Sequence, residues 1–136
     1  MQAEPLGLHP SIVALSARRR HEALARLTTP SVAGTTLVVL GRGASDPGAV
    51  GRLREFAAAS VAAGVDRRPE RVELGFAAAA RPTIDEALAR AASAGHGRVV
   101  VQPHLLFAGH VEGEVAAAVT RARIAWPRVE WVEVGR

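Results

Sequence analysis

The sequence contains no cysteine and no lysine among its 136 residues, and aromatic residues make up only 4% of it. Without cysteine the chain has no disulfide, no thiolate nucleophile and no cysteine-ligated zinc or iron–sulfur site. Without lysine it cannot form a Schiff base through a side chain or hold phosphate with a P-loop lysine. No apolar run approaches the roughly 20 residues that a membrane-spanning helix needs.

The basic residues are all arginines, 17 in number, and they give a formal net charge of +4. This bias, together with the richness in alanine, is typical of a high-GC coding sequence. Single arginines can still bind a carboxylate or a phosphate as a planar fork. Acidic residues are interspersed throughout and aromatics are scarce, so the composition does not favour a nucleic-acid-binding protein.

The length is suited to one domain. The first ten residues, "MQAEPLGLHP", lack the basic, apolar and small-residue regions of a signal peptide. We therefore expect a cytoplasmic protein, and the absence of cysteine agrees with that expectation.

The hydrophobic pattern predicts one helix, followed by four strands that alternate with three further helices. The helices are expected at 10–27, 46–64, 82–95 and 111–126, and the strands at 35–40, 71–77, 98–103 and 128–134. The first helix has an apolar stripe, and its arginines are expected to face solvent. Asp46 and Pro47 are typical of an N-cap and a first helical residue. The last strand alternates apolar and polar residues, which indicates an edge strand.

This order predicts an α/β fold, a three-layer sandwich in which helices cover both faces of a four-stranded, mainly parallel sheet. In such sheets ligands bind beyond the carboxyl ends of the strands. The rule selects three loops, at 41–47, 77–82 and 102–114.

The first of these loops contains "GRGASDPG", which is neither a dinucleotide-binding fingerprint nor a Walker A loop. Gly41 and Gly43 permit unusual backbone conformations and the close approach of a ligand. Arg42 between them is placed to project from the sheet edge toward a cleft. Two interpretations remain open: an anion-binding turn, or a tight strand-to-helix turn with Asp46 as an ordinary cap.

The third loop contains "PHLLFAGHVEGEV". His104 follows the third strand, and His110 stands near the start of the last helix. If that helix includes His110, Glu114 lies four residues on and shares its face. A histidine beside a carboxylate can hold a divalent metal or transfer protons. Capping or surface histidines would give the same spacing.

The two motifs in this order resemble the CbiX-type sirohydrochlorin chelatases, over about residues 35–134. The quoted segments are "LVVLGRGASDPGAV" and "LGFAAAARPTIDEALARAASAGHGRVVVQPHLLFAGHVEGEV". The resemblance implies a chelatase-like fold and a single half-domain over 1–136, with the N-terminal helix and linker at 1–34 and the core at 35–136.

The chain departs from the family pattern at its central residue, because Arg42 stands where the family has a histidine. The segment "AGH" makes His110 only an approximate match to the second family histidine, and the loop "GFAAAARP" lacks the usual acidic residue. Arginine neither accepts a proton at neutral pH nor ligates a cation. It can bind the acetate and propionate groups of sirohydrochlorin. The sequence is therefore most similar to the second, degenerate half of a long, two-half member.

The resemblance implies three sets of site residues. His110 and His104 would be catalytic. The metal ligands would be His104, His110, Glu112 and Glu114, and the substrate would bind at Gly41, Arg42, Gly43, Ser45 and Arg81.

The implied function is insertion of a divalent metal, cobalt or iron, into a tetrapyrrole in cobalamin or sirohaem biosynthesis, with the metal as substrate and no organic cofactor. The implied partner is a second chelatase half-domain, in cis or in a homodimer. One alternative is a non-catalytic structural or tetrapyrrole-binding half of a two-lobed chelatase. Another is an unrelated anion-binding α/β domain.

Overall fold

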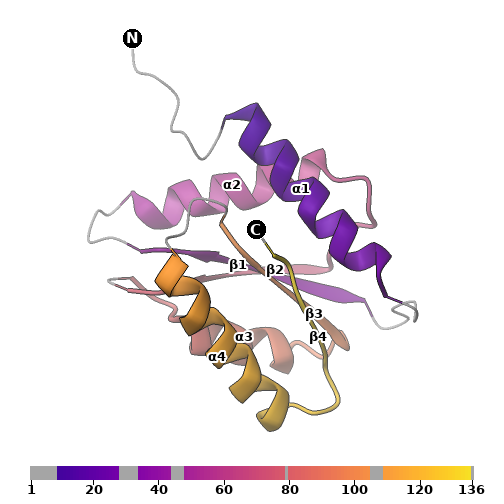
Figure 1. Ribbon diagram of the computed structural model, residues 1–136, viewed down its shortest axis with the longest axis vertical. Helices are drawn as coiled ribbons and strands as arrows, with labels where there is room; N and C mark the ends of the chain where they lie inside the picture. The colour runs from indigo at the N-terminus through magenta and orange to yellow at the C-terminus, as the bar shows by residue number, and fades with distance from the viewer. Residues whose placement is uncertain (1–8, 28–33, 44–47, 79, 105–108, 136) are drawn as a thin grey trace.

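The computed structural model describes residues 9–27, 34–43, 48–78, 80–104 and 109–135, without the side chains of 109–111. These residues form helices and strands in the expected alternation (Figure 1). The elements are α1 (Pro10–Ala25), β1 (Thr35–Gly41), α2 (Ala49–Ala63), β2 (Arg71–Phe76), α3 (Ile84–Ser93), β3 (Arg98–Pro103), α4 (Gly109–Ala125) and β4 (Glu130–Glu133).

The strands form one four-stranded sheet in the order β2-β1-β3-β4. Every neighbouring pair is parallel, which confirms the predicted fold class. The central strand β1 pairs with both β2 and β3, so that Val39 lies between Leu74 and Gln102. Within the described residues no helix is long and apolar enough to cross a membrane.

Helices cover both faces of the sheet, with α1 and α2 on one side and α3 and α4 on the other (Figure 1). The alternation of side chains along β1 divides its residues between the two layers. Val38 and Leu40 pack with α3 and α4, whereas Leu37 and Val39 pack with α1 and α2. These four side chains are at most 1% exposed, as expected for a strand that is apolar on both faces.

Helix α3 begins as its sequence predicts. Thr83 is its N-cap and forms a reciprocal capping box with Glu86. Helix α2 begins later than predicted, because Gly48 is its N-cap and no side chain caps it. The prediction that Asp46 is the N-cap of this helix was therefore wrong. Asp46 and Pro47 themselves lie outside the described residues.

The last strand, β4, is shorter than the predicted 128–134 but occupies the expected sheet edge. Its central residues Trp131 and Val132 are buried, on opposite sides of the sheet. The flanking Glu130 and Glu133 are exposed. The alternating pattern had identified the edge correctly and overestimated its length.

Helix α1 corrects one expectation, because Arg20 does not face solvent. Its side chain is only 6% exposed and lies between α1, α2 and β3. One guanidinium nitrogen donates to Ser60 Oγ at 2.8 Å and to Gln102 Oε1 at 2.9 Å. The other donates to the Ser60 carbonyl at 2.8 Å. Three donor contacts compensate for burying a charge that cannot be lost.

The same network fixes Gln102 from its other end. Its amide Nε2 donates to the Ser16 carbonyl at 2.7 Å and to Ser16 Oγ at 3.0 Å. Ser16, Ser60 and Gln102 are each at most 2% exposed, so these polar groups have no access to water. Burial also lowers the pKa of Arg20. The network therefore attaches α1 to β3 at Gln102, which lies one residue before Pro103 and two before His104.

We predict that Arg20→Ala lowers the free energy of unfolding by about 2–4 kcal/mol, because it leaves a cavity and removes three hydrogen bonds from buried groups. Urea unfolding followed by circular dichroism measures this. Arg18→Ala is the matched control, since Arg18 is exposed on the same helix. An Arg20→Ala protein as stable as the Arg18→Ala protein would contradict the prediction.

Candidate functional site

Backbone hydrogen bonds join the chain at the end of β1 to the loops that follow β2 and β3. Three consecutive carbonyl groups, those of residues 40–42, are the acceptors. The Leu40 carbonyl accepts from the His104 N–H at 2.8 Å, and the Gly41 carbonyl from the Ala77 N–H at 3.0 Å. The Arg42 carbonyl accepts from the Ala78 N–H at 3.2 Å. The loops that follow β1, β2 and β3 therefore meet at one edge of the sheet, as the strand order predicted.

The two glycines of "GRG" are required for different reasons. Gly41 is buried, and a Cβ there would lie 2.9 Å from Leu53 Cδ2, so its role is close packing in the core. Gly43 has a φ of +84°, and a Cβ there would lie 1.7 Å from the Ala78 carbonyl oxygen. Glycine at 43 therefore allows both the left-handed turn and the contact between the first two loops.

Arg42 is exposed at this edge. In the described part of the chain its side chain takes part in no ion pair, so its guanidinium is available to an anion from outside. Ser45, the other polar residue predicted to bind substrate in this turn, lies outside the described residues.

Arg81, on the second loop, has a carboxylate partner within the chain. Its Nε and Nη2 donate to the two oxygens of Glu86 at 3.2 and 2.8 Å, as a two-point contact. The Arg81 guanidinium lowers the pKa of the Glu86 carboxyl to about 2, with help from the Thr83 N–H. A substrate carboxylate would compete with Glu86 for Arg81, whereas none of the described carboxylates is paired with Arg42.

His104 begins the third loop and turns its ring toward α2. The imidazole lies against Phe56, with ring centroids 4.2 Å apart and planes inclined at 44°. Burial lowers the pKa of His104, since the apolar surroundings disfavour the imidazolium. The ring is therefore neutral at physiological pH, which is the form that accepts a proton or ligates a metal.

The remaining predicted residues belong to α4. His110 is the second residue of the helix, and its side chain lies outside the described part. Glu112 is half-buried in the first turn. Glu114 lines a hollow of about 280 Å³ between α3 and α4, together with Asp85 and Arg121.

The structure thus brings Gly41, Arg42, Gly43 and His104 to one edge. It places the ring of His104 on the α2 side and Glu114 on the α3–α4 side. Among the described side chains no group of three or more histidine and acidic residues is close enough to hold a metal ion. The predicted ligand set, which includes His110, stays a prediction.

Three residues that contribute to this edge were not predicted. Phe56 sets the environment of the His104 ring, and its place in an apolar helical pattern indicated only a core residue. Ala77 and Ala78 hold the first turn through their N–H groups. Backbone donors carry no side-chain signal in the sequence, although the run of small residues in "GFAAAARP" is compatible with a close approach.

A parallel sheet covered on both faces, with a glycine turn and a histidine at its carboxyl edge, defines an α/β protein of the class in which ligands bind beyond the strand ends. The family model of CbiX matches residues 36–134, and the chain belongs to this family. This match confirms the resemblance found in the motifs and removes the alternative of an unrelated anion-binding domain.

The relatives are longer than this chain. A sirohydrochlorin cobaltochelatase of Priestia megaterium is 28% identical over 131 residues, which cover 96% of this chain and 42% of that protein. SirB from Bacillus subtilis with Fe³⁺ superposes with a TM-score of 0.69 at 19% identity, over 97% of this chain and 50% of its own. The chain therefore spans about half the length of these relatives or less.

A second solved structure is closer in length. A putative cobalamin biosynthesis CbiX protein from Marinobacter aquaeolei VT8 superposes with a TM-score of 0.56 at 22% identity. The superposition covers 74% of this chain and 80% of that one. At this level of identity the likeness supports the fold.

We predict that Gly43→Ala lowers the free energy of unfolding by about 1–3 kcal/mol, because alanine is strained at positive φ and its Cβ would collide with the Ala78 carbonyl. Gly51→Ala is the control: a Cβ in that turn of α2 would meet nothing within 4 Å, and alanine should stabilise the helix by up to about 1 kcal/mol. Urea unfolding of both variants measures the difference. Equal effects at the two glycines would contradict the steric argument.

We predict that the Glu86 carboxyl titrates with a pKa of about 2 and that Arg81→Met raises this pKa toward the ordinary value. Because the folded-state pKa lies below the unfolded one, the ion pair contributes stability above the unfolded pKa, and this contribution is lost as the pH falls through the folded pKa. Carbon-detected NMR titration of the Glu86 carboxyl measures it. An unchanged pKa in Arg81→Met would leave the Thr83 cap as the cause.

Proposed function

We propose that this chain is one half-domain of a sirohydrochlorin chelatase, which binds the tetrapyrrole at the carboxyl edge of its sheet and takes part in inserting a divalent metal. The membership of the CbiX family over residues 36–134 carries this proposal. The convergence of the glycine turn and His104 at one edge supports it. Cobalt is the first metal to test because the curated relative is a cobaltochelatase.

Arg42 is proposed to bind a carboxylate of the tetrapyrrole. A planar guanidinium matches a carboxylate in a two-point contact. Arg42 is exposed and takes part in no ion pair within the described residues, whereas Arg81 is already bound to Glu86. We therefore assign the main substrate contact to Arg42, with Arg81 as a weaker second contact.

The proton and metal chemistry is proposed to fall to the histidines. Metal insertion requires removal of two pyrrole protons, and a neutral imidazole can accept one of them at a time, passing it to solvent before the next. His104 is kept neutral by burial. His110, Glu112 and Glu114 are the further candidates for guiding the incoming metal, which is a substrate here and does not stay bound.

A second half-domain is proposed to complete the site. The chain spans 42% of the cobaltochelatase and 50% of SirB, so each of these proteins has room for two such units. The second unit would be attached in cis or would be another copy of this chain. A unit attached in cis would supply the histidine that Arg42 replaces, whereas another copy of this chain would bring a second Arg42.

The non-catalytic half is the second candidate, and one observation favours it. Arginine in the central position of "GRG" cannot take a proton at neutral pH. In that case this chain would bind the tetrapyrrole and another half would perform the chemistry.

The test is a titration of the full chain with sirohydrochlorin, followed by absorbance, before and after addition of cobalt(II). We expect binding, and we expect Arg42→Ala to weaken it by roughly tenfold through the loss of one charge-assisted contact. Arg128→Ala is the control, because Arg128 is exposed just before β4 and is therefore remote from the carboxyl ends of the strands.

The rate of cobalt insertion then separates the two candidates. Acceleration that is lost in His104→Ala would make this chain a working chelatase. Binding without acceleration would make it the non-catalytic half. Absence of binding, or equal binding by Arg42→Ala and the original chain, would overturn the proposed substrate contact.

A further inference from the structure

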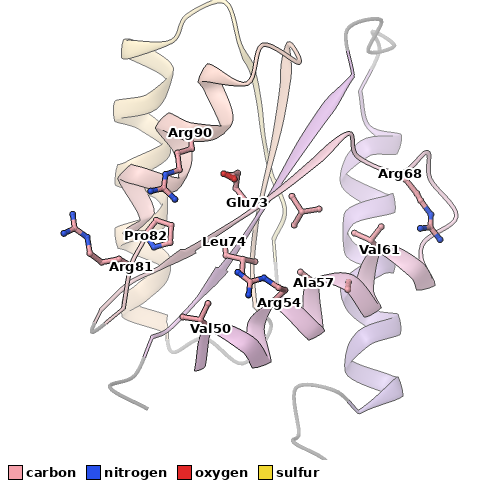
Figure 2. A pocket seen from close by; sticks show the side chains of 12 residues that line it. Val50, Arg54, Ala57, Val61, Arg68, Glu73, Leu74, Arg81, Pro82 and Arg90 are labelled. Atoms are coloured by element: carbon pink, nitrogen blue, oxygen red, sulfur yellow. The ribbon is translucent and has the colours of Figure 1, made fainter. Parts of the chain in front are cut away.

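One hollow of the molecule runs along the outer side of β2, and the loop after β2 contributes Arg81 and Pro82 to its lining. Its volume is about 590 Å³, within the range of ligand-binding clefts. Figure 2 shows Val50, Arg54, Ala57 and Val61 succeeding one another along α2, with Leu74 of β2 nearby. We refer to this hollow as the β2 groove.

The outer side of β2 is a strand edge on which hydrogen-bonding groups remain available. The Ala77 N–H points inward to Gly41, and the Phe76 N–H points outward to the Pro82 carbonyl at 2.9 Å. Alternate backbone groups point to opposite sides of a strand, so Val72 and Leu74 present theirs on the same outer side as Phe76. No other strand of the described chain pairs with this edge.

The edge already accepts a strand at one end. Phe76 and Thr83 form an isolated parallel bridge, in which the chain returns to pair with its own β2. Beyond that bridge the edge continues past Leu74 to Val72, an apolar residue that is 40% exposed. This edge of β2 therefore has the geometry that pairing with an added strand requires, and the chain itself pairs with it at Phe76 and Thr83.

The charges that line the groove are strongly unbalanced. Arginines from α2, α3 and the loop before β2 contribute to its lining, with Glu73 as the one acidic residue. Glu73 is engaged by Arg71, outside the lining, at 3.3 Å. In the described part of the chain Arg54, Arg68 and Arg90 take part in no ion pair. The groove therefore combines an apolar wall with three unpaired guanidinium groups.

We propose that the β2 groove binds an extended acidic segment of a partner protein, which adds to the sheet as a fifth strand beside β2. Main-chain groups of Val72 and Leu74 would pair with the segment, as in other cases of strand addition. Its apolar side chains would face the wall formed by α2, and its carboxylates would bind Arg54, Arg68 and Arg90. A second copy of this edge would bring like charges together, which disfavours self-pairing.

The probe is a fluorescein-labelled peptide of alternating residues, Glu-Val-Glu-Val-Glu-Val, added to the full chain at low ionic strength. We expect binding by fluorescence anisotropy and slower hydrogen exchange at the Val72 and Leu74 amides. Arg54→Glu and Arg90→Glu should each weaken binding by about fivefold or more. Arg128→Glu, the same charge change near the opposite edge, should leave binding unchanged except for the general effect of net charge.

A second peptide tests the strand. It has the same side chains, but alternate residues are N-methylated, so one edge of its backbone cannot donate hydrogen bonds. The proposal requires that it bind at least tenfold more weakly. Equal binding of the two peptides would overturn strand addition, and equal loss of binding in Arg54→Glu and Arg128→Glu would overturn the groove.

The proposal rests on Arg54, Arg68 and Arg90, which the proposed tetrapyrrole contacts do not include, although Arg81 lines the groove as well. The two proposals are distinguished by the same variants. Sirohydrochlorin binding should depend on Arg42 and be insensitive to Arg90→Glu. If sirohydrochlorin instead displaces the peptide, and Arg90→Glu weakens both, the groove is a site for a small polycarboxylate and the proposal of a protein partner is overturned.

Discussion

Three consecutive carbonyl groups at the end of β1 hold the functional edge together. Leu40, Gly41 and Arg42 each accept a hydrogen bond from a different residue, two in the loop after β2 and one in the loop after β3. Because these are backbone contacts, the positions of the loops follow from the strand register and tolerate most side chains. The exception is Gly43, where the approach of Ala78 leaves no room for a Cβ. The placement of Arg42 and His104 depends on this junction.

The buried network around Arg20 extends that junction to the far side of β3. Gln102 is held by Arg20 and by Ser16, both on α1, and the chain reaches His104 two residues later. A motion of α1 would thus be transmitted to the strand end that carries the histidine. The N-terminal helix is for this reason a structural part of the described unit, whichever segment precedes it in a longer relative.

The fold could be predicted because its signals are local and repetitive. The apolar runs of β1 and β3, and the capping box at Thr83, specify a parallel sheet and a helix start without reference to distant residues. Arg20 could not be predicted, because a hydrophobic pattern assigns arginine to solvent and does not show a buried glutamine 82 positions away. The pairing of Arg81 with Glu86 could not be predicted from helical spacing, because Arg81 lies in the loop before the Thr83 cap and Glu86 lies in the helix after it.

Arginine at position 42 changes how the chemistry is divided within the site. A histidine there would both accept protons and approach the metal, whereas an arginine can do neither and repels a cation. The neutral ring of His104 is the described group that can still accept a proton, and it lies against Phe56 on the α2 side. A substrate bound by Arg42 would therefore contact this chain through a carboxylate of its rim. The base that removes its protons would come either from His104 and His110 or from a second half-domain. The geometry favours the rim contact as the contribution of this unit, because that contact needs only the exposed guanidinium and the backbone junction beneath it.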